Sequence, residues 1–257
     1  MTYPDLQVEV KDDIAVVRLM RASKRNALSD GLILALQEVF EKLPSNVRAA
    51  VIDGDGPHFC AGLDLSELKE RDAAQGMHHS RMWHAALDRI QHGPVPVIAA
   101  LHGAVVGGGL ELASACHIRV ADSSTFYALP EGSRGIFVGG GGSVRIPKLI
   151  GVARMTDMML TGRVYGAEDG ERAGFAQYLV PEGTAFDKAV ELARRLSENA
   201  PLTNYALMHA LPRIAEQPAD HGFFTESLIC AIAQAAPEAK GRLRDFLEGR
   251  AAKVSKE

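Results

Sequence analysis

The stretch HGAVVGGGLELA, residues 102–113, decides the fold of this 257-residue chain. Its three successive glycines, Gly107 to Gly109, stand between an apolar run and a predicted helix. Glycine has no Cβ, so such a turn can take positive φ and bring main-chain N–H groups close to a ligand. Because the first N–H groups of a helix lack intrahelical acceptors and the helix dipole favours negative charge there, the stretch predicts a site for a negatively charged oxygen.

A second stretch, HFCAGLDL at residues 58–65, is built in a similar way. The small residues Ala61 and Gly62 follow a short predicted strand, and Asp64 and Ser66 are placed to cap a following helix. Either stretch alone also fits an ordinary tight turn between a strand and a helix. If one N–H group from each converges on one point, the two form an oxyanion hole, which stabilises charge developing on a carbonyl oxygen.

Two glutamates lie close to these stretches in the sequence. Glu111 comes two residues after the last glycine, in the first predicted helical turn, and Glu131 follows Pro130 in a predicted loop. Their ordinary interpretations are a helix-start charge that complements the dipole and a solvated loop charge. Two carboxylates beside one small cavity would instead have their pKa values pushed apart by repulsion and desolvation, so that one acts as acid and the other as base.

The surrounding pattern predicts an α/β fold. Leu6 to Val10 and Ile14 to Met20 predict a hairpin, and Ser29 caps a predicted helix that ends at Pro44. Strands alternate with helices through residue 127, which predicts a mainly parallel sheet. The predicted strands after the hairpin span 49–52, 97–101 and 117–121, and the later predicted helices span 144–150, 153–160, 185–197, 202–214, 223–235 and 237–248.

Composition places the chain among globular proteins without an affinity for polyanions. Hydrophobic residues make up 47% of the chain, enough for a full core, and 28 Lys and Arg against 32 Asp and Glu give a net charge of −4. We therefore expect neither a nucleic-acid partner nor a membrane partner. Residues 1–13 carry no export signal, and the three cysteines form no C-x-x-C pair, so we expect reduced thiols in the cytoplasm.

Other catalytic motifs are absent or incomplete in the sequence. The nine histidines do not include an H-E-x-x-H pair, so no metal site is predicted. Residues 141–145 read GGSVR, which has arginine where a G-x-S-x-G nucleophile elbow needs glycine. Residues 54–59 read GDGPHF and fail the dinucleotide motif at the last position, and no P-loop lysine follows the glycines at 139–142.

These motifs, taken in order, resemble the crotonase (enoyl-CoA hydratase/isomerase) superfamily from about Val16 to the final helix. The matching segments are 24–28, 59–65, 102–113, 129–131, 135–136, 141–145, 149–151 and 160–163. The resemblance implies a spiral of ββα units over residues 1–200 and a C-terminal helical extension over 201–257 that caps a neighbouring subunit. It also implies a homotrimer or a homohexamer.

The resemblance further implies an acyl-CoA substrate and no bound prosthetic group, since coenzyme A is part of the substrate. Ala61 and Gly108 are expected to supply the two N–H groups that hold the thioester oxygen. Arg250 is expected to replace the lysine that hydratases often carry at position 249, which is glycine here. The implied substrate-binding residues are Ala22, Lys24, Arg25, Ala61, Gly62, Leu63, Asp64, Leu65, Gly107, Pro130, Gly139 and Arg250.

Glutamate at both 111 and 131 matches the hydratase arrangement, in which water adds to C3 of a 2-enoyl thioester. We expect Glu131 to donate the proton to C2 and Glu111 to orient and deprotonate the water. Double-bond isomerisation is an alternative, and the run at 128–150 is also similar to methylthioacryloyl-CoA hydratases. Val138, where many relatives have proline, and four successive glycines from Gly139 suggest an unusual acyl pocket. A non-catalytic acyl-CoA-binding or RNA-binding role is the remaining alternative.

Overall fold

The computed structural model describes residues 3–67 and 69–250, which form two compact units. The first unit extends to Ser197 and the second begins at Glu198, whereas the sequence places this boundary near Pro201. In the part of the chain that the structure describes, no helix combines the length and the apolar character needed to cross a membrane.

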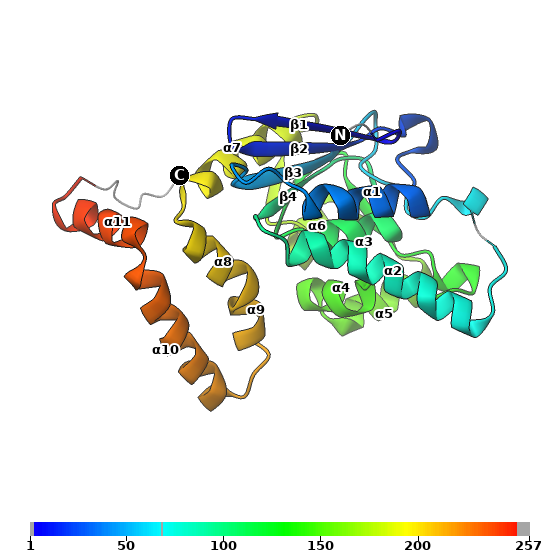
Figure 1. Ribbon diagram of the computed structural model, residues 1–257. Helices are drawn as coiled ribbons and strands as arrows, with labels where there is room; N and C mark the ends of the chain where they lie inside the picture. Colours follow the sequence, from blue (N-terminus) through cyan, green and yellow to red (C-terminus); the bar gives the residue numbers. More distant parts are fainter. Residues whose placement is uncertain (1–2, 68, 251–257) are drawn as a thin grey trace. The chain divides into compact units, whose positions relative to one another are not determined.

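The larger sheet of the first unit is antiparallel only at its first pair of strands. Its strand order is β1 (Leu6–Lys11), β2 (Ile14–Leu19), β3 (Ala49–Gly54), β4 (Val97–Leu101), β6 (Ile118–Asp122) and β9 (Tyr178–Val180). The β1–β2 hairpin is confirmed, and every later pair in this sheet is parallel. The α/β fold with a mainly parallel sheet, predicted from the sequence, is therefore present (Figure 1).

Both faces of the central strands β3 and β4 are buried, and alternate residues of a strand point to opposite faces. In β3, Ala50 and Ile52 belong to the large core cluster that includes α1 (Asp30–Glu41) and α2 (Ala73–Gln91). Ala49 and Val51 pack in a second cluster with α7 (Ala185–Glu198). Figure 1 shows α1, α2 and α3 (Gly108–Ala115) together on one side of β1 to β4. Two covered faces explain the uninterrupted apolar runs in the strands.

Helix α1 begins where the sequence predicts. The Ser29 hydroxyl accepts a hydrogen bond from the Leu32 N–H at 3.1 Å, which satisfies one of the unpaired donors of the first turn. The helix ends at Glu41, three residues before Pro44. The helix thus ends slightly earlier than predicted, because the residues just before a proline disfavour helical geometry and the last turn frays.

A smaller sheet brings the glycine-rich turn and the loop of Glu131 together. It consists of β5 (Ala104–Val106), β7 (Phe126–Ala128) and β8 (Tyr165–Gly166), with β5 and β7 parallel. The carboxyl ends of two parallel neighbours lie side by side, so the start of α3 after β5 and the loop after β7 share one edge. An isolated bridge from Cys60 to Val105 adds the 58–65 stretch to the same edge.

The rest of the first unit contains two helices that were predicted, and one helix and one strand that the sequence pattern did not reveal. Helix α4 (Gly142–Ile150) starts two residues earlier than predicted, because Gly141 takes φ of 96° as its N-cap and lets the chain enter the helix sooner. Helix α5 (Val152–Thr161) is close to its predicted range. Helix α6 (Ala167–Ala173) and strand β9 were not predicted, since their runs are too short to display a period.

The second unit consists of α8 (Pro201–His209), α9 (Leu211–Ile214), α10 (Ala219–Ala235) and α11 (Pro237–Leu247). The single helix predicted over 202–214 is wrong, because the helix breaks at Ala210. Pro212 lacks the N–H that would bond the Met208 carbonyl, and its ring crowds that carbonyl. The large apolar side chains exposed in this unit are Leu202, Tyr205, Leu207, Leu211, Phe223, Phe224, Leu228, Ile232, Leu243, Phe246 and Leu247.

Candidate active site

The first N–H donor of the site is at the start of α3. Gly107, with φ of 52°, is the N-cap, and its own N–H donates to the Ala128 carbonyl at 2.9 Å, which ties the turn to the end of β7. Gly108 is the first residue of α3, and no described residue accepts a hydrogen bond from its N–H. This free donor has the orientation that the first turn of a helix gives it.

The assignment of Ala61 as the second donor is wrong. The Ala61 N–H donates to the Arg25 carbonyl at 2.9 Å and is not available to a ligand. The segment also leads into a three-residue 3-10 helix, η2 (Leu65–Glu67), and not into the α-helix that the sequence predicts.

The structure places the Leu63 N–H where Ala61 was expected. Leu28 bonds the residues on either side of it, donating to the Gly62 carbonyl at 2.7 Å and accepting from the Asp64 N–H at 2.8 Å. Within the described residues the Leu63 N–H has no acceptor. A Cβ built on Gly108 would lie 3.5 Å from the Leu63 nitrogen, so these two unpaired donors are neighbours. The positive φ of Gly62, 95°, breaks the simple alternation of N–H directions, which sequence inspection alone does not reveal.

Glu111 is held by main-chain N–H groups from a loop 30 residues later in the chain. Its Oε1 accepts from the Gly140 and Gly142 N–H groups, each at 2.8 Å. The side chain is buried, and this burial raises the pKa of the carboxyl to about 7. The two N–H groups lower the pKa, whereas the nearby charge of Glu131 raises it further.

Lack of space explains the glycines at 140, 141 and 142. A Cβ on Gly142 would lie 2.9 Å from Glu111 Oε1, and one on Gly140 would lie 3.1 Å from Oε2. Gly141 has positive φ, and a Cβ there would collide with the Arg145 guanidinium. Arg145 in turn donates to the Gly140 carbonyl at 2.9 Å. A loop without side chains can therefore wrap around Glu111.

Glu131 lies in a different environment. Its Oε2 is buried and has no hydrogen-bond partner among the described residues. Burial raises the pKa of this carboxyl, and its own N–H and the charge of Arg134 oppose the rise. A Cβ on Gly107 would come within 2.7 Å of Glu131 Oε1, so the carboxyl lies directly against the glycine turn. Glu131 and both free N–H groups thus lie at Gly107 and Gly108. The Glu111 carboxyl lies at the 139–142 loop, near enough for the charge of Glu131 to raise its pKa.

The loop at residues 22–25, which carries three of the implied substrate-binding residues, lies beside the 58–65 stretch. Lys24, at the end of the 3-10 helix η1 (Ala22–Lys24), donates to Asp64 Oδ2 at 2.8 Å. Arg21, which the sequence analysis missed, donates to the same oxygen at 2.7 Å. Hydrogen bonds from Lys24, Ser66 and Arg21 hold the pKa of Asp64 well below its usual range. Asp64 therefore anchors the two cationic side chains, and Lys24 remains half-exposed.

Other predicted site residues have separate surroundings. Arg250 is in the second unit and forms an ion pair with Asp245 at 2.6 Å. The Gly139 carbonyl accepts from the Ser80 hydroxyl at 2.6 Å, and Leu65 is exposed. Pro130 is half-buried. Val138, which the sequence places at the acyl pocket, is buried, whereas its neighbours Ile136 and Phe137 are exposed.

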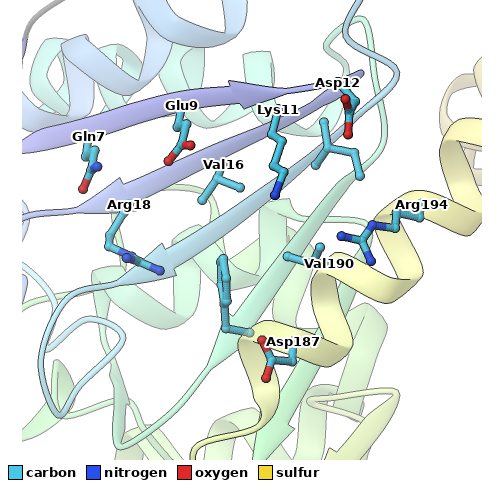
Figure 2. A pocket seen from close by; sticks show the side chains of 11 residues that line it. Gln7, Glu9, Lys11, Asp12, Val16, Arg18, Asp187, Val190 and Arg194 are labelled. Atoms are coloured by element: carbon cyan, nitrogen blue, oxygen red, sulfur yellow. The ribbon is translucent and has the colours of Figure 1, made fainter.

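A groove of about 540 Å³ lies elsewhere on the first unit. Figure 2 shows it between the β1–β2 hairpin and α7, with Glu9, Lys11 and Arg18 on the strands and Asp187 and Arg194 on the helix. Among the described residues, none of the predicted site residues lines it. The described chain also lacks any group of three His, Cys, Asp or Glu side chains arranged to hold a metal ion.

Comparisons with known proteins show the family to which the chain belongs. The family model described as enoyl-CoA hydratase/isomerase matches residues 9–256. The crystal structure of a provisionally named enoyl-CoA hydratase from Rhodopseudomonas palustris CGA009 is similar, with 59% identity, a TM-score of 0.94 and coverage of 97% of both chains.

Two curated relatives are similar at lower identity. Enoyl-CoA hydratase EchA19 of Mycobacterium tuberculosis is 28% identical over 253 residues, covering 96% of this chain and 95% of its own. The human mitochondrial methylglutaconyl-CoA hydratase is 35% identical over 196 residues, covering 74% of this chain and 58% of its own. The chain is thus an enoyl-CoA hydratase-like enzyme with the crotonase fold, and it belongs to the enoyl-CoA hydratase/isomerase family.

Proposed function

We propose that the protein hydrates a 2-enoyl-CoA thioester to a 3-hydroxyacyl-CoA, with water added between Glu111 and Glu131. The observation that carries this proposal is a pair of buried carboxyls with raised pKa, close enough for the charge of Glu131 to raise the pKa of Glu111. Glu131 lies against the glycine turn that also carries the free Gly108 N–H. Relatives named as hydratases of different enoyl-CoA compounds support hydration as the reaction class.

The thioester oxygen is bound by the N–H groups of Leu63 and Gly108. When a nucleophile attacks C3 of the conjugated thioester, electron density moves through C2 to this oxygen and forms an enolate. Two fixed donors stabilise that charge without reorganisation, and losing one donor in a comparable site costs about 10²–10³ in rate. These two donors are the unpaired main-chain N–H groups described above.

The two carboxyls differ in the form that their surroundings favour. Glu111 receives two N–H hydrogen bonds on Oε1, which stabilise the carboxylate, the form that accepts a proton from water. Glu131 has a buried oxygen without a donor, which favours the protonated acid. We therefore assign Glu111 as the base that deprotonates the water and Glu131 as the acid that protonates C2.

The reaction balances without an added co-reactant. The water oxygen forms a bond to C3 while its proton passes to Glu111, and the enolate collapses as C2 takes the proton of Glu131. The C2–C3 double bond becomes a single bond, with both additions on the face where the two carboxyls lie. The return of a proton from Glu111 to Glu131 restores the starting state. Two coupled carboxyls with raised pKa values can exchange this proton near neutral pH.

A spectroscopic assay tests the function. Purified protein mixed with crotonyl-CoA should abolish the absorbance of the conjugated thioester and yield 3-hydroxybutyryl-CoA. A parallel assay with a 3-enoyl-CoA distinguishes isomerisation, because an isomerase product keeps its unsaturation. If the conjugated absorbance persists with every 2-enoyl thioester of a panel while the 3-enoyl-CoA is converted, the reaction is isomerisation and the hydration proposal is wrong.

We also propose that the second unit assembles with other copies of the chain. Its exposed side chains include Phe223, Phe224, Ile232 and Phe246, and such concentrated apolar surface is typical of an interface. Light scattering coupled to gel filtration should give the mass of a trimer or a hexamer. A monomer at micromolar concentration would contradict the proposal.

A further inference from the structure

Helix α2 lies against the glycines of the site, and its Trp83 side chain lies beside two of them, Gly108 and Gly140. A Cβ on Gly108 would lie 3.2 Å from Trp83 Cζ3, and one on Gly140 would lie 3.2 Å from Cε3. One edge of the indole therefore faces both the glycine that binds the thioester oxygen and the glycine that holds Glu111. The side chain is 4% exposed, so it is packed in the wall and does not project into solvent.

The indole is fixed in this position by a hydrogen bond at its opposite edge. Its Nε1–H donates to Asp30 Oδ1 at 3.1 Å, and His79 on the same helix bonds that oxygen at 2.7 Å. Asp30 is the first residue of α1, and Arg71 lies 3.7 Å from its other oxygen. A ring tied at one edge and packed at the other cannot swing away to admit a larger ligand at low cost.

The same face of α2 also contacts the rest of the glycine loop. Ser80, one turn before Trp83, donates to the Gly139 carbonyl at 2.6 Å. A Cβ on Gly141 would come within 3.7 Å of His84 Cδ2. Thus α2 and the 139–142 loop form a continuous wall, and Trp83 is its largest side chain between the two glycines.

We propose that Trp83 closes the acyl pocket just beyond C3, so that the enzyme prefers short, compact 2-enoyl groups. This inference rests on the proposed function, which places C1 at Gly108 and C3 beside Glu111. Carbons that extend from C3 on the Gly140 side meet the indole edge. A rigid aromatic wall excludes extra methylene groups because both the ring and the helix behind it would have to move.

Trp83 is the only tryptophan of the chain, which supplies a direct test. Addition of butyryl-CoA should change the emission of this indole, whereas coenzyme A alone should leave it nearly constant. Decanoyl-CoA should bind more weakly than butyryl-CoA. Equal emission changes with coenzyme A and butyryl-CoA would overturn the placement of the acyl group against Trp83, and this readout requires no turnover.

The second test compares Trp83→Ala with the wild type on 2-enoyl thioesters of four to ten carbons. The ratio of kcat/KM for the ten-carbon to the four-carbon substrate should rise about tenfold or more, the discrimination that a pocket achieves for a single methylene. Trp83→Phe, which keeps a ring but loses the bond to Asp30, should give a smaller rise. An unchanged ratio in Trp83→Ala would overturn the proposal.

A control variant distinguishes direct contact between Trp83 and the acyl group from a general destabilisation of α2. Ile90→Ala removes a fully buried side chain two turns further along α2 and should lower the melting temperature without changing the chain-length ratio. An equal change of the ratio in Ile90→Ala would contradict a specific role for Trp83. The two proposals can fail separately. If the wild type does not hydrate enoyl thioesters but binds short acyl-CoA more tightly than long, and Trp83→Ala abolishes this preference, the proposed function is overturned and the role of Trp83 in the acyl pocket is retained.

Discussion

Glu111 and Glu131 belong to regions that are built in different ways. Glu111 lies on a helix, and one of its oxygens accepts two N–H groups from the 139–142 loop. Glu131 lies in a short turn after β7, with a buried oxygen that no described group bonds. The difference teaches that two buried carboxyls of equal chemistry can be set apart chiefly by the main-chain donors that one of them receives and the other lacks.

The largest expected effect comes from removing the unbonded carboxyl. Glu131→Gln keeps the shape of the side chain but cannot give a proton to C2, so kcat should fall by about 10²–10⁴. Steady-state hydration of crotonyl-CoA measures kcat, and calorimetry with butyryl-CoA should show nearly unchanged binding. Wild-type turnover in this variant would refute the assignment of Glu131 as acid.

A single-atom change tests the corrected oxyanion hole. Replacement of the Leu63 amide by an ester, through incorporation of the α-hydroxy analogue of leucine, removes the N–H and keeps the side chain. We expect kcat/KM to fall by about 10²–10³, as for loss of one oxyanion donor.

The same ester at Ala61 is the control. It removes only the bond to the Arg25 carbonyl, so it should cost stability and little catalysis. A larger catalytic loss at Ala61 than at Leu63 would restore the original assignment.

A methyl group added to the loop sharpens the contrast between the two carboxyls. The Cβ of Gly142→Ala would lie 2.9 Å from both Cγ and Oε1 of Glu111 and should displace that carboxyl. A displacement of a catalytic group by about 1 Å can lower the rate about 10²-fold, so we expect kcat to fall by that factor. Gly166→Ala, where nothing lies within 4 Å of the new Cβ, is the matched control and should keep wild-type activity. Equal activity of the two variants would argue against a role for the loop.

The smallest effect is on stability. Burial raises the pKa of Glu111 to about 7, above the value near 4.5 of an unfolded glutamate. The folded state thus holds its proton more tightly, and the stability that this gives is complete below about pH 4.5 and is lost as pH rises through 7. The free energy of unfolding should fall by on the order of 3 kcal/mol across this range.

Glu111→Gln carries no such proton, so its stability should vary less with pH. Urea unfolding of both proteins at several pH values measures the slopes. Parallel slopes for the two proteins would contradict the raised pKa of Glu111.

Most of the first unit could be predicted from its sequence, because burial on both faces of a parallel sheet leaves long apolar runs. The Ser29 cap, the hairpin and the start of α3 all follow from local patterns. The pairing of Glu111 with the 139–142 loop could not be derived locally, since its partners lie about 30 residues away and use only main-chain atoms.

The misplaced donor has a different physical cause. Ala61 and Leu63 differ by two positions, and sequence spacing alone favours neither. The choice depends on the φ of Gly62 and on the bonds of Arg25 and Leu28, which are tertiary features. Trp83 was also missed, because an apolar residue on an amphipathic helix is first taken as ordinary core.

The division of labour between main chain and side chains affects how the protein can change over time. The groups that hold Glu111 and the predicted thioester oxygen are peptide N–H groups, which most substitutions leave in place. A Cβ at Gly108, Gly140 or Gly142 would nevertheless crowd Trp83 or Glu111. The proposed acyl wall is one side chain on α2, which a single codon change can shrink or enlarge. Such a chain can acquire a new substrate range by mutation while its chemistry stays constant.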